Sequence, residues 1–319
     1  LDEHRTFVRE FFDGLAELGV FGLTVGEQHG GAGMGLVPYV AALEAVGAHS
    51  GSLARLWIGQ AQVAAALEAV GDGRLDDVLQ GSRLATYVGA ENRVTLQGEQ
   101  LSGRVELQPA AEQAELFVVA ATEGGEPVLV ALDASAVERS ARRTLGLASC
   151  GCAALNIKGP AVILARGEAA AAAIQRAEVM GLLGVAAAAV GGGEGAAAAA
   201  QKHAAERIAF GKPLLAQQAV QRKLVDCRHA IAAARQLTWH AARLNDQQPA
   251  IDAVLHARLA AVDAMVRTAD EAIQIHGGFG YTVEYHVERH YRDAVTFDVL
   301  DGGSGPLRDR LAALQFQAV

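Results

Sequence analysis

Apolar residues recur at intervals of three and four over the first 82 residues, which is the spacing of amphipathic helices. Between Thr6 and Leu18 they form one stripe, made of Phe7, Val8, Phe11, Phe12, Leu15 and Leu18. A glycine-rich segment at residues 27–35 (EQHGGAGMG) interrupts the pattern, which returns at residues 37–47 and 58–70 and stops each time at or next to a glycine. Residues 1–82 are therefore predicted to form an N-terminal helical domain.

Residues 83–167 show short apolar runs separated by polar segments that contain glycine. The runs at residues 116–121, 128–132 and 161–164 have the length of strands, and LQGEQLSG at residues 96–103 has the turn chemistry of a hairpin. These features predict a small β-rich middle domain, a barrel or a sandwich.

From residue 168 to residue 319 the pattern is helical again and rich in alanine. Segments broken by Gly-Lys-Pro, Asn-Asp-Gln-Gln-Pro and His-Gly-Gly predict an antiparallel four-helix bundle, with helices near residues 176–209, 214–244, 249–276 and 304–316. Glycine costs about 1 kcal/mol per residue inside a helix, so Gly191–Gly193 indicate close helix packing or a bend. The predicted fold is mainly α with a β-rich middle domain.

Composition and charge exclude several classes of protein. Hydrophobic residues make up 51% of the 319 residues and charged residues 20%, so the chain is not a disordered polymer. The net charge of −9 argues against binding to nucleic acid. The apolar runs are mostly alanine and glycine and fall short of the roughly 20 strongly apolar residues of a membrane span, and the first residues lack the pattern of a secretory leader. We expect no membrane insertion and a cytoplasmic location.

Three segments near the end of the chain carry a specific resemblance. They read ERIAFGKPLLAQQ at residues 206–218, IQIHGGFGYTVEYHVERHYRD at residues 273–293 and VLDGG at residues 299–303. In this order and spacing they resemble the acyl-CoA dehydrogenase family of flavoproteins. ELGVFGLTVGEQHGGAGMG, at residues 17–35, resembles the same family more weakly, and the middle domain matches it poorly.

The resemblance implies that the chain binds FAD and oxidises an acyl-CoA thioester. It places Arg207, Phe210 and Gln218 at the phosphates and adenosine of FAD, and it places Gln274, Gly277, Gly278 and Gly280 at the dinucleotide across a subunit interface. A guanidinium pairs well with phosphate, and glycines let backbone N–H groups approach an anion. The alternative is structural: Phe-Gly-Lys-Pro ends one helix and His-Gly-Gly caps another.

The resemblance also implies a catalytic base. Counting without a gap from Arg292 and Asp293, the family's catalytic glutamate falls on Asp301, whose side chain is one methylene shorter. The alternative is that Asp301 only forms a tight turn with the two glycines that follow. Nitroalkane oxidases, a related branch, use an aspartate at this point to abstract an acidic carbon proton, so the resemblance leaves a nitroalkane-oxidase-like flavoenzyme as a minor alternative. The other base position of the family falls near Gly181, where Glu178 could substitute only if the helix slipped in register; we expect a solvated or first-turn glutamate.

Partners follow from the same resemblance. The expected partners are an acyl-CoA substrate, an electron-transferring flavoprotein or similar acceptor, and further subunits, in a homodimer, a homotetramer or a heteromer with a second dehydrogenase-like chain. No tryptophan lies between Trp57 and Trp239, and the family's flavin-covering segment is missing, so Tyr87, Thr86 or Thr95 would have to replace those contacts. A partner subunit that lacks activity of its own and a helical scaffold without a cofactor are the alternatives.

Two groups of residues offer weaker hypotheses. Cys150 and Cys152 form a C-x-C pair, and His286 and His290 lie four residues apart, a spacing found among helical metal ligands. No third ligand accompanies either pair, so we expect no metal site, and we expect the histidines to be solvated or capping.

Overall fold

The computed structural model describes residues 5–316. The chain divides into two compact units. Unit 1 comprises residues 1–39, 55–144 and 148–182, and unit 2 comprises residues 40–54, 145–147 and 183–319. Residues 1–4 and 317–319, which the predicted first and last domains include, lie outside the described residues. The predicted three-domain division at residues 82 and 167 stays a prediction.

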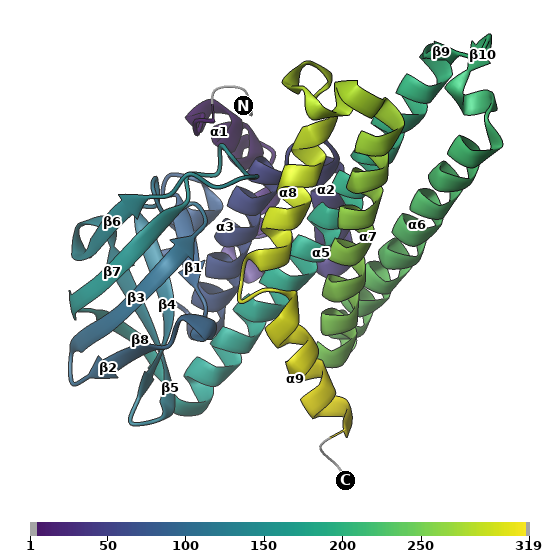
Figure 1. The fold of residues 1–319 in the computed structure, drawn as a ribbon. Coiled ribbons are helices and arrows are strands. Elements are labelled where there is room, and N and C mark those ends of the chain that lie inside the picture. The colour runs from purple at the N-terminus through teal and green to yellow at the C-terminus, as the bar shows by residue number, and fades with distance from the viewer. Residues whose placement is uncertain (1–4, 317–319) are drawn as a thin grey trace. The chain divides into compact units, whose positions relative to one another are not determined.

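One mixed sheet and several short helices make up most of unit 1 (Figure 1). The strand order is β6-β7-β3-β2-β4-β5-β8, and β1 pairs with β4 off this path. Strand β4 runs parallel to β1 and β2, and the other neighbours are antiparallel. The strands are β1 (Ala85–Val88), β2 (Val94–Gln97), β3 (Gln100–Gln108), β4 (Leu116–Glu123), β5 (Glu126–Asp133), β6 (Val137–Ala141), β7 (Ala153–Pro160) and β8 (Val162–Arg166).

Two tight turns confirm the hairpin chemistry of the sequence. Gln97 pairs with Gln100 around Gly98, and Glu123 pairs with Glu126 around Gly124 and Gly125. The three glycines have φ between 60° and 94°, a region that favours glycine. The strand-length runs at residues 116–121 and 128–132 lie within β4 and β5, as predicted.

The helices at the start of the chain also follow the predicted pattern. The stripe between Thr6 and Leu18 forms a helix that buries Phe12 and Leu15, and the glycine-rich segment that follows contains only a short 3-10 turn at Glu27–His29. The helices are α1 (Arg9–Glu17), α2 (Leu36–His49), α3 (Gly51–Val70) and α4 (Leu75–Leu79).

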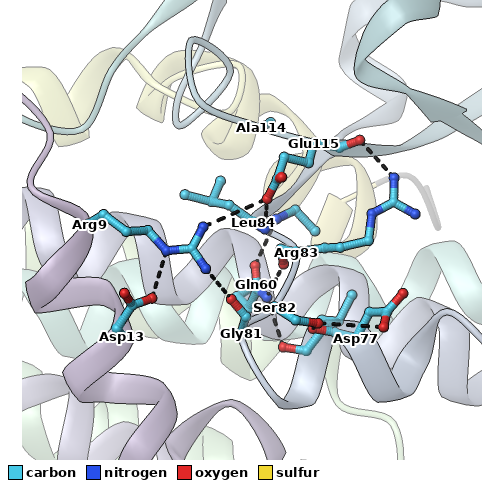
Figure 2. Close-up of polar contacts among 12 residues, drawn as sticks. Arg9, Asp13, Gln60, Asp77, Gly81, Ser82, Arg83, Leu84, Ala114 and Glu115 are labelled. Atoms are coloured by element: carbon cyan, nitrogen blue, oxygen red, sulfur yellow. Dashed lines mark hydrogen bonds and ion pairs between the residues drawn. The ribbon is translucent and has the colours of Figure 1, made fainter.

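A buried amide joins α3 and α4 to the first strand. Gln60 is fully buried, and its Nε2 donates to the carbonyls of Val78 and Arg83, each at 2.8 Å. Its Oε1 accepts from the N–H of Ala85 at 2.8 Å. Figure 2 shows this network beside Glu115, which accepts from the N–H of Leu84. Because every polar atom of the amide has a partner, the network fixes how the chain enters β1.

The C-terminal region contains five helices within the described residues: the four that were predicted and one more, α8. Most of the residues of α8 were interpreted as part of a family motif, and no helix was predicted there. The first helix begins earlier than predicted and runs without a break through the glycines. The helices are α5 (Gly167–Glu206), α6 (Gln218–Gln247), α7 (Ile251–His276), α8 (Val287–Val299) and α9 (Ser304–Phe316). In unit 2, α7 packs against α6, α8 and α9 (Figure 1).

Glycines on α5 let its backbone approach α2 closely in unit 2. A Cβ atom added to Gly191 would lie 2.0 Å from the carbonyl oxygen of Glu44, and one added to Gly195 would lie 2.6 Å from the carbonyl oxygen of Ala48. Gly47 on α2 approaches the carbonyl oxygen of Ala188 in the same way, at 2.5 Å. The close packing predicted for this stretch is confirmed, because no side chain larger than hydrogen fits at these contacts.

Ion pairs surround this helix contact. The Nε atom of Arg235 on α6 lies 2.6 Å from Glu44 on α2, and its guanidinium also reaches Glu194 on α5 at 3.4 Å. Arg228 contacts Glu194 at 2.8 Å. A linked set of partly buried charges of this kind specifies which helices are neighbours.

Helix α5 is long and apolar enough to cross a membrane by length and composition alone. However, 83% of its most apolar 18-residue window is buried inside the protein. Core helices pass the same test, and the alanine and glycine content of α5 suits close packing between helices.

Replacing Gly191 with alanine tests the helix contact. We expect Gly191→Ala to lower the free energy of unfolding by about 1–3 kcal/mol, because the new methyl group meets the backbone of α2. Gly14→Ala in α1 is the matched control, since a Cβ there meets nothing within 4 Å, and it should raise the free energy of unfolding by about 0.4–1 kcal/mol. Urea denaturation measures both. A stabilised Gly191→Ala variant would contradict the packing described.

Candidate functional site

The first cluster of predicted cofactor residues lies where α5 ends. The N–H of Arg207 donates to the carbonyl of His203 at 2.9 Å, and its carbonyl accepts from the N–H of Leu214 at 2.8 Å. Between these points the chain makes a two-stranded hairpin, β9 (Ile208–Ala209) and β10 (Lys212–Pro213). The prediction that Phe-Gly-Lys-Pro ends a helix is confirmed, and the hairpin holds Phe210 with 96% of its side chain exposed.

The second cluster lies where α7 ends. Gly277 has φ +63°, and its N–H donates to the carbonyls of Gln274 and Ile273, so His-Gly-Gly is a helix cap, as the alternative predicted. A Cβ on Gly280 would lie 2.6 Å from the carbonyl oxygen of Ile273, whereas one on Gly278 would meet nothing within 4 Å. Gly280 is therefore required by the turn itself, while Gly278 leaves open space for a group from outside the chain.

The structure brings these two clusters together. The guanidinium of Arg207 lies 5.9 Å from the ring centre of Phe279, at the distance of a cation–π contact. Arg207 is exposed, and among residues 5–316 no carboxylate forms an ion pair with it. An uncompensated guanidinium beside an exposed glycine backbone is suited to an anion.

A cluster of rings that the sequence did not reveal lies beside Arg207. The rings of His203 and His276 stack with centres 4.3 Å apart, and Tyr285 meets both edge-on. Phe279 lies 5.1 Å from Tyr285. His276 is buried, and its Nδ1 lies 2.8 Å from the carbonyl oxygen of Ala272; because a carbonyl only accepts, Nδ1 carries a proton. The one available signal was that His203 lies in the last turn of α5, four residues before Arg207.

Burial and the neighbouring His276 and Arg207 make His203 less basic. Desolvation lowers the pKa of His203 first, and the nearby His276 and Arg207 lower it further. Its ordinary pKa is about 6.5, so His203 is neutral at neutral pH and adds no charge beside Arg207.

The remaining predicted cofactor residues complete the set of hydrogen-bond donors. Gln218 is the first residue of α6, and Gln274 lies in the last turn of α7; both side chains are exposed. One guanidinium, two amides and an open glycine backbone fit the phosphates and adenosine of FAD by their donor chemistry. In unit 2, therefore, the residues present fit the dinucleotide part of the cofactor.

Asp301 lies in a tight turn, as one of its two interpretations predicted. It has φ +55°, and the N–H of Gly303 donates to the carbonyl of Leu300 at 3.0 Å. The side chain is half-buried. The turn follows α8, whose 13 residues span about 20 Å, and the glycine segment precedes that helix. Within one chain the structure does not bring Asp301 together with the cluster around Arg207.

The second base position carries no carboxylate. A Cβ at Gly181 would lie 2.3 Å from Nε2 of Gln62 in unit 1, so the Gln62 amide occupies the space that a side chain at this position would need. The prediction of a first-turn glutamate at position 178 was wrong, because α5 begins at Gly167 and Glu178 lies in its interior, half-buried.

Two of the suggested replacements for the flavin contacts are buried in unit 1. The hydroxyl of Thr86 donates to the carbonyl of Pro109 at 2.9 Å and accepts from Gln108. The hydroxyl of Tyr87 is buried without a hydrogen-bond partner among the described residues, and desolvation raises its pKa strongly. Thr95 is exposed on β2.

Comparison with known proteins places these motifs in a family. The family model for the C-terminal domain of acyl-CoA dehydrogenase matches residues 170–315, and the model for its N-terminal domain matches residues 1–75, together about two thirds of the chain. The chain belongs to the acyl-CoA dehydrogenase family. The resemblance stated from the motifs is confirmed, and with it an oxidoreductase family and the fold class.

Similar proteins cover the chain to different extents. Human mitochondrial short-chain specific acyl-CoA dehydrogenase is 41% identical over 126 residues, which are 39% of this chain and 31% of that protein. This chain therefore matches that relative over about a third of its length. The probable acyl-CoA dehydrogenase YngJ of Bacillus subtilis is 28% identical over 95% of this chain and 89% of that protein. A glutaryl-CoA dehydrogenase from Mycobacterium smegmatis, solved in complex with FADH2, shares the fold with a TM-score of 0.87 at 19% identity, over 99% of this chain and 88% of that chain.

The histidine pair suggested by its spacing does not form a metal site. His286 caps α8 from outside with φ +53°, whereas His290 is buried within the helix. Over residues 5–316, no group of three histidine, cysteine or acidic side chains is placed to hold a metal ion. The expectation of solvated or capping histidines is met by His286, which is the N-cap residue of α8, and was wrong for His290, which packing buries on the inner face of the helix.

The pKa of His203 can be measured by NMR titration. We expect it to lie below about 6.5, so its contribution to stability is present above that pH and is lost as the pH falls. His276→Gln removes the imidazole that lowers the pKa of His203 and should raise that pKa towards its ordinary value. His240→Gln, a change at a histidine that does not contact this cluster, is the control. An unchanged pKa in His276→Gln would show that the stacked pair is not coupled.

Proposed function

We propose that this chain is an FAD-dependent acyl-CoA dehydrogenase subunit that removes the α-proton of an acyl-CoA thioester while the β-hydrogen leaves as hydride. The observation that carries the proposal is that Arg207 lies next to the glycine segment with open backbone at Gly278. Arg207 has no carboxylate partner among the described residues. Membership of the family supports the same chemistry.

When bound, FAD would supply the hydride acceptor. The residues of this chain bind and orient it. The Arg207 guanidinium pairs with phosphate, and the exposed Gln218 and Gln274 amides provide neutral donors or acceptors for the adenosine. The guanidinium of Arg207 lies over the ring of Phe279. The turn at Gly277 and Gly278 has no side chains that would hinder a phosphate from reaching the backbone.

Asp301 is the proposed base. A carboxylate in a tight turn has a fixed backbone, which restricts where its oxygen atoms can lie. The side chain is one methylene shorter than glutamate, and a misplacement of about 1 Å can cost on the order of a hundredfold in rate. The proposal therefore requires an acyl-CoA whose α-carbon lies closer to this turn than a glutamate would need.

Two observations in unit 2 support the proposal that subunits associate. Asp301 and the Arg207 cluster lie at opposite ends of α8, so a dinucleotide held at one chain's cluster could present its ring to another chain's carboxylate. Phe210 and Tyr281 are 96% and 89% exposed, an aromatic surface that is costly to leave in water. We therefore propose a homodimer, a homotetramer or a heteromer, and transfer of electrons to an electron-transferring flavoprotein or similar acceptor.

A half-site partner subunit is the second candidate. It is favoured by the shortened carboxylate and by the commitment of Thr86 and Tyr87 to the interior of unit 1. Such a chain would hold part of the FAD while a second dehydrogenase-like chain supplies the base.

Arg207→Gln tests the cofactor cluster. Because a charge-assisted hydrogen bond to phosphate contributes about 1.5–3 kcal/mol, we expect the Kd for FAD to rise by about 10- to 100-fold. Arg222→Gln, an exposed change on α6, is the matched control and should leave the Kd unchanged. The absorption spectrum of bound flavin gives the measurement. A purified protein that takes up no FAD would contradict the proposal.

Asp301→Asn tests the base. Flavin content should remain, while the rate at which acyl-CoA bleaches the flavin absorbance under anaerobic conditions should fall by about a hundredfold or more. Asp309→Asn on α9, which changes an exposed carboxylate, is the control. Equal bleaching rates in wild type and Asp301→Asn, measured in a complex with a second chain, would instead support the half-site role.

A further inference from the structure

Two cysteines that the proposed function does not use lie together in unit 1. Cys150 is fully buried, Cys152 is 3% exposed, and neither is in a disulfide. Their side chains lie within hydrogen-bonding reach of each other, and this contact raises the pKa of Cys150 and lowers the pKa of Cys152. Gly151 between them has φ +69°, a backbone conformation that favours glycine, and the side-chain oxygen of Gln113 lies close to it.

One of the two thiols faces a cavity. A cavity of about 700 Å³ within unit 1 is lined by Cys152 but not by Cys150. It is lined also by three arginines and one glutamate, so the charge of its wall is positive: Arg5, Arg142, Arg143 and Glu112. The thiol that opens on the cavity is therefore presented to anions.

The three arginines differ in whether their guanidinium groups already have hydrogen-bond partners in the protein. Arg5 donates to the carbonyl of Thr144, and Arg142 donates to the hydroxyl of Ser140 at 2.9 Å. Arg143 is exposed, and within the described part of the chain it has no hydrogen-bond or ion-pair partner. Arg143 thus offers one cation to an anionic ligand in the cavity.

The surroundings shift the pKa values of the two cysteines in opposite directions. The hydrogen bond from Cys150 lowers the pKa of Cys152, and buried Arg55 and Thr144 lower it further against the opposing effect of burial. The same hydrogen bond and burial raise the pKa of Cys150. A thiol of lowered pKa that lines a cavity, next to a buried thiol of raised pKa, is the arrangement of a dithiol that exchanges with disulfides.

We propose that Cys150 and Cys152 form a redox-active dithiol that is oxidised by small anionic disulfides bound in the arginine-lined cavity. The Cys152 thiolate attacks one sulfur of the disulfide, forms a mixed disulfide and releases the first thiolate. Cys150 then loses its proton, attacks the Cys152 sulfur and releases the second thiolate. The cysteine pair loses two electrons, the disulfide gains them, and the two cysteine protons go to the two released thiolates.

Charge selection provides the test. In a Cys227→Ser background, which removes the remaining cysteine, the folded protein is treated with 3,3′-dithiodipropionate, an anionic disulfide, or with cystamine, a cationic one. Mass spectrometry follows the loss of two hydrogens from the peptide that holds both cysteines. We expect the anionic disulfide to react at least about tenfold faster. Arg143→Gln should remove most of this preference, and Arg104→Gln on β3, which is exposed and paired with Glu106, should not.

Single-cysteine variants identify the order of the steps. Cys150→Ser should accumulate a mixed disulfide on Cys152, and Cys152→Ser should leave Cys150 reduced. If either variant does not fold, alkylation of the unmutated pair decides, because iodoacetate should then outpace iodoacetamide at Cys152 relative to free cysteine. Equal rates for the anionic and cationic disulfides would overturn the proposal, as would reaction only at the rate of global unfolding.

Discussion

The contact between α2 and α5 is the constraint on which the arrangement of unit 2 depends. At Gly191 the two backbones are so close that a methyl group would lie 2.0 Å from the carbonyl of Glu44. Such an approach requires residues without side chains, and the chain supplies glycine and alanine along the whole of α5. The same helix that makes this contact ends at Glu206, directly before Arg207. A displaced α5 would therefore move the cofactor cluster.

The cluster around Arg207 illustrates how helix ends assemble a binding surface. Two chain segments, more than 60 residues apart, each leave a helix through a tight turn, and both turns expose backbone. The same residues end the helices and form the proposed binding surface. Gly277 caps α7 and also begins the open backbone, so its role as a helix cap and its role beside a dinucleotide do not compete. The neutral His203 leaves Arg207 as the charge that faces solvent.

Unit 1 contains chemistry of a different kind. Its sheet buries apolar residues against α3 and the start of α5, and one of its loops places Cys152 at a positively charged cavity with Cys150 next to it. Family membership accounts for the motifs of unit 2, whereas the thiol pair follows from side-chain positions in this chain. An oxidoreductase whose subunit also carried a dithiol would respond to the thiol–disulfide balance of its surroundings.

The sequence alone determined the elements and the family. Helical periodicity located α1 and α2, turn chemistry located the hairpin at residues 96–103, and the ordered motifs from Arg207 to Asp301 indicated the family, because these signals are local along the chain. It missed α8, since residues read as a motif were not also read for their periodicity. Only the tertiary structure stacked His203 on His276, filled the position facing Gly181 with Gln62, and placed Cys152 beside Arg143. These contacts join residues distant in sequence, and packing decides which of them meet.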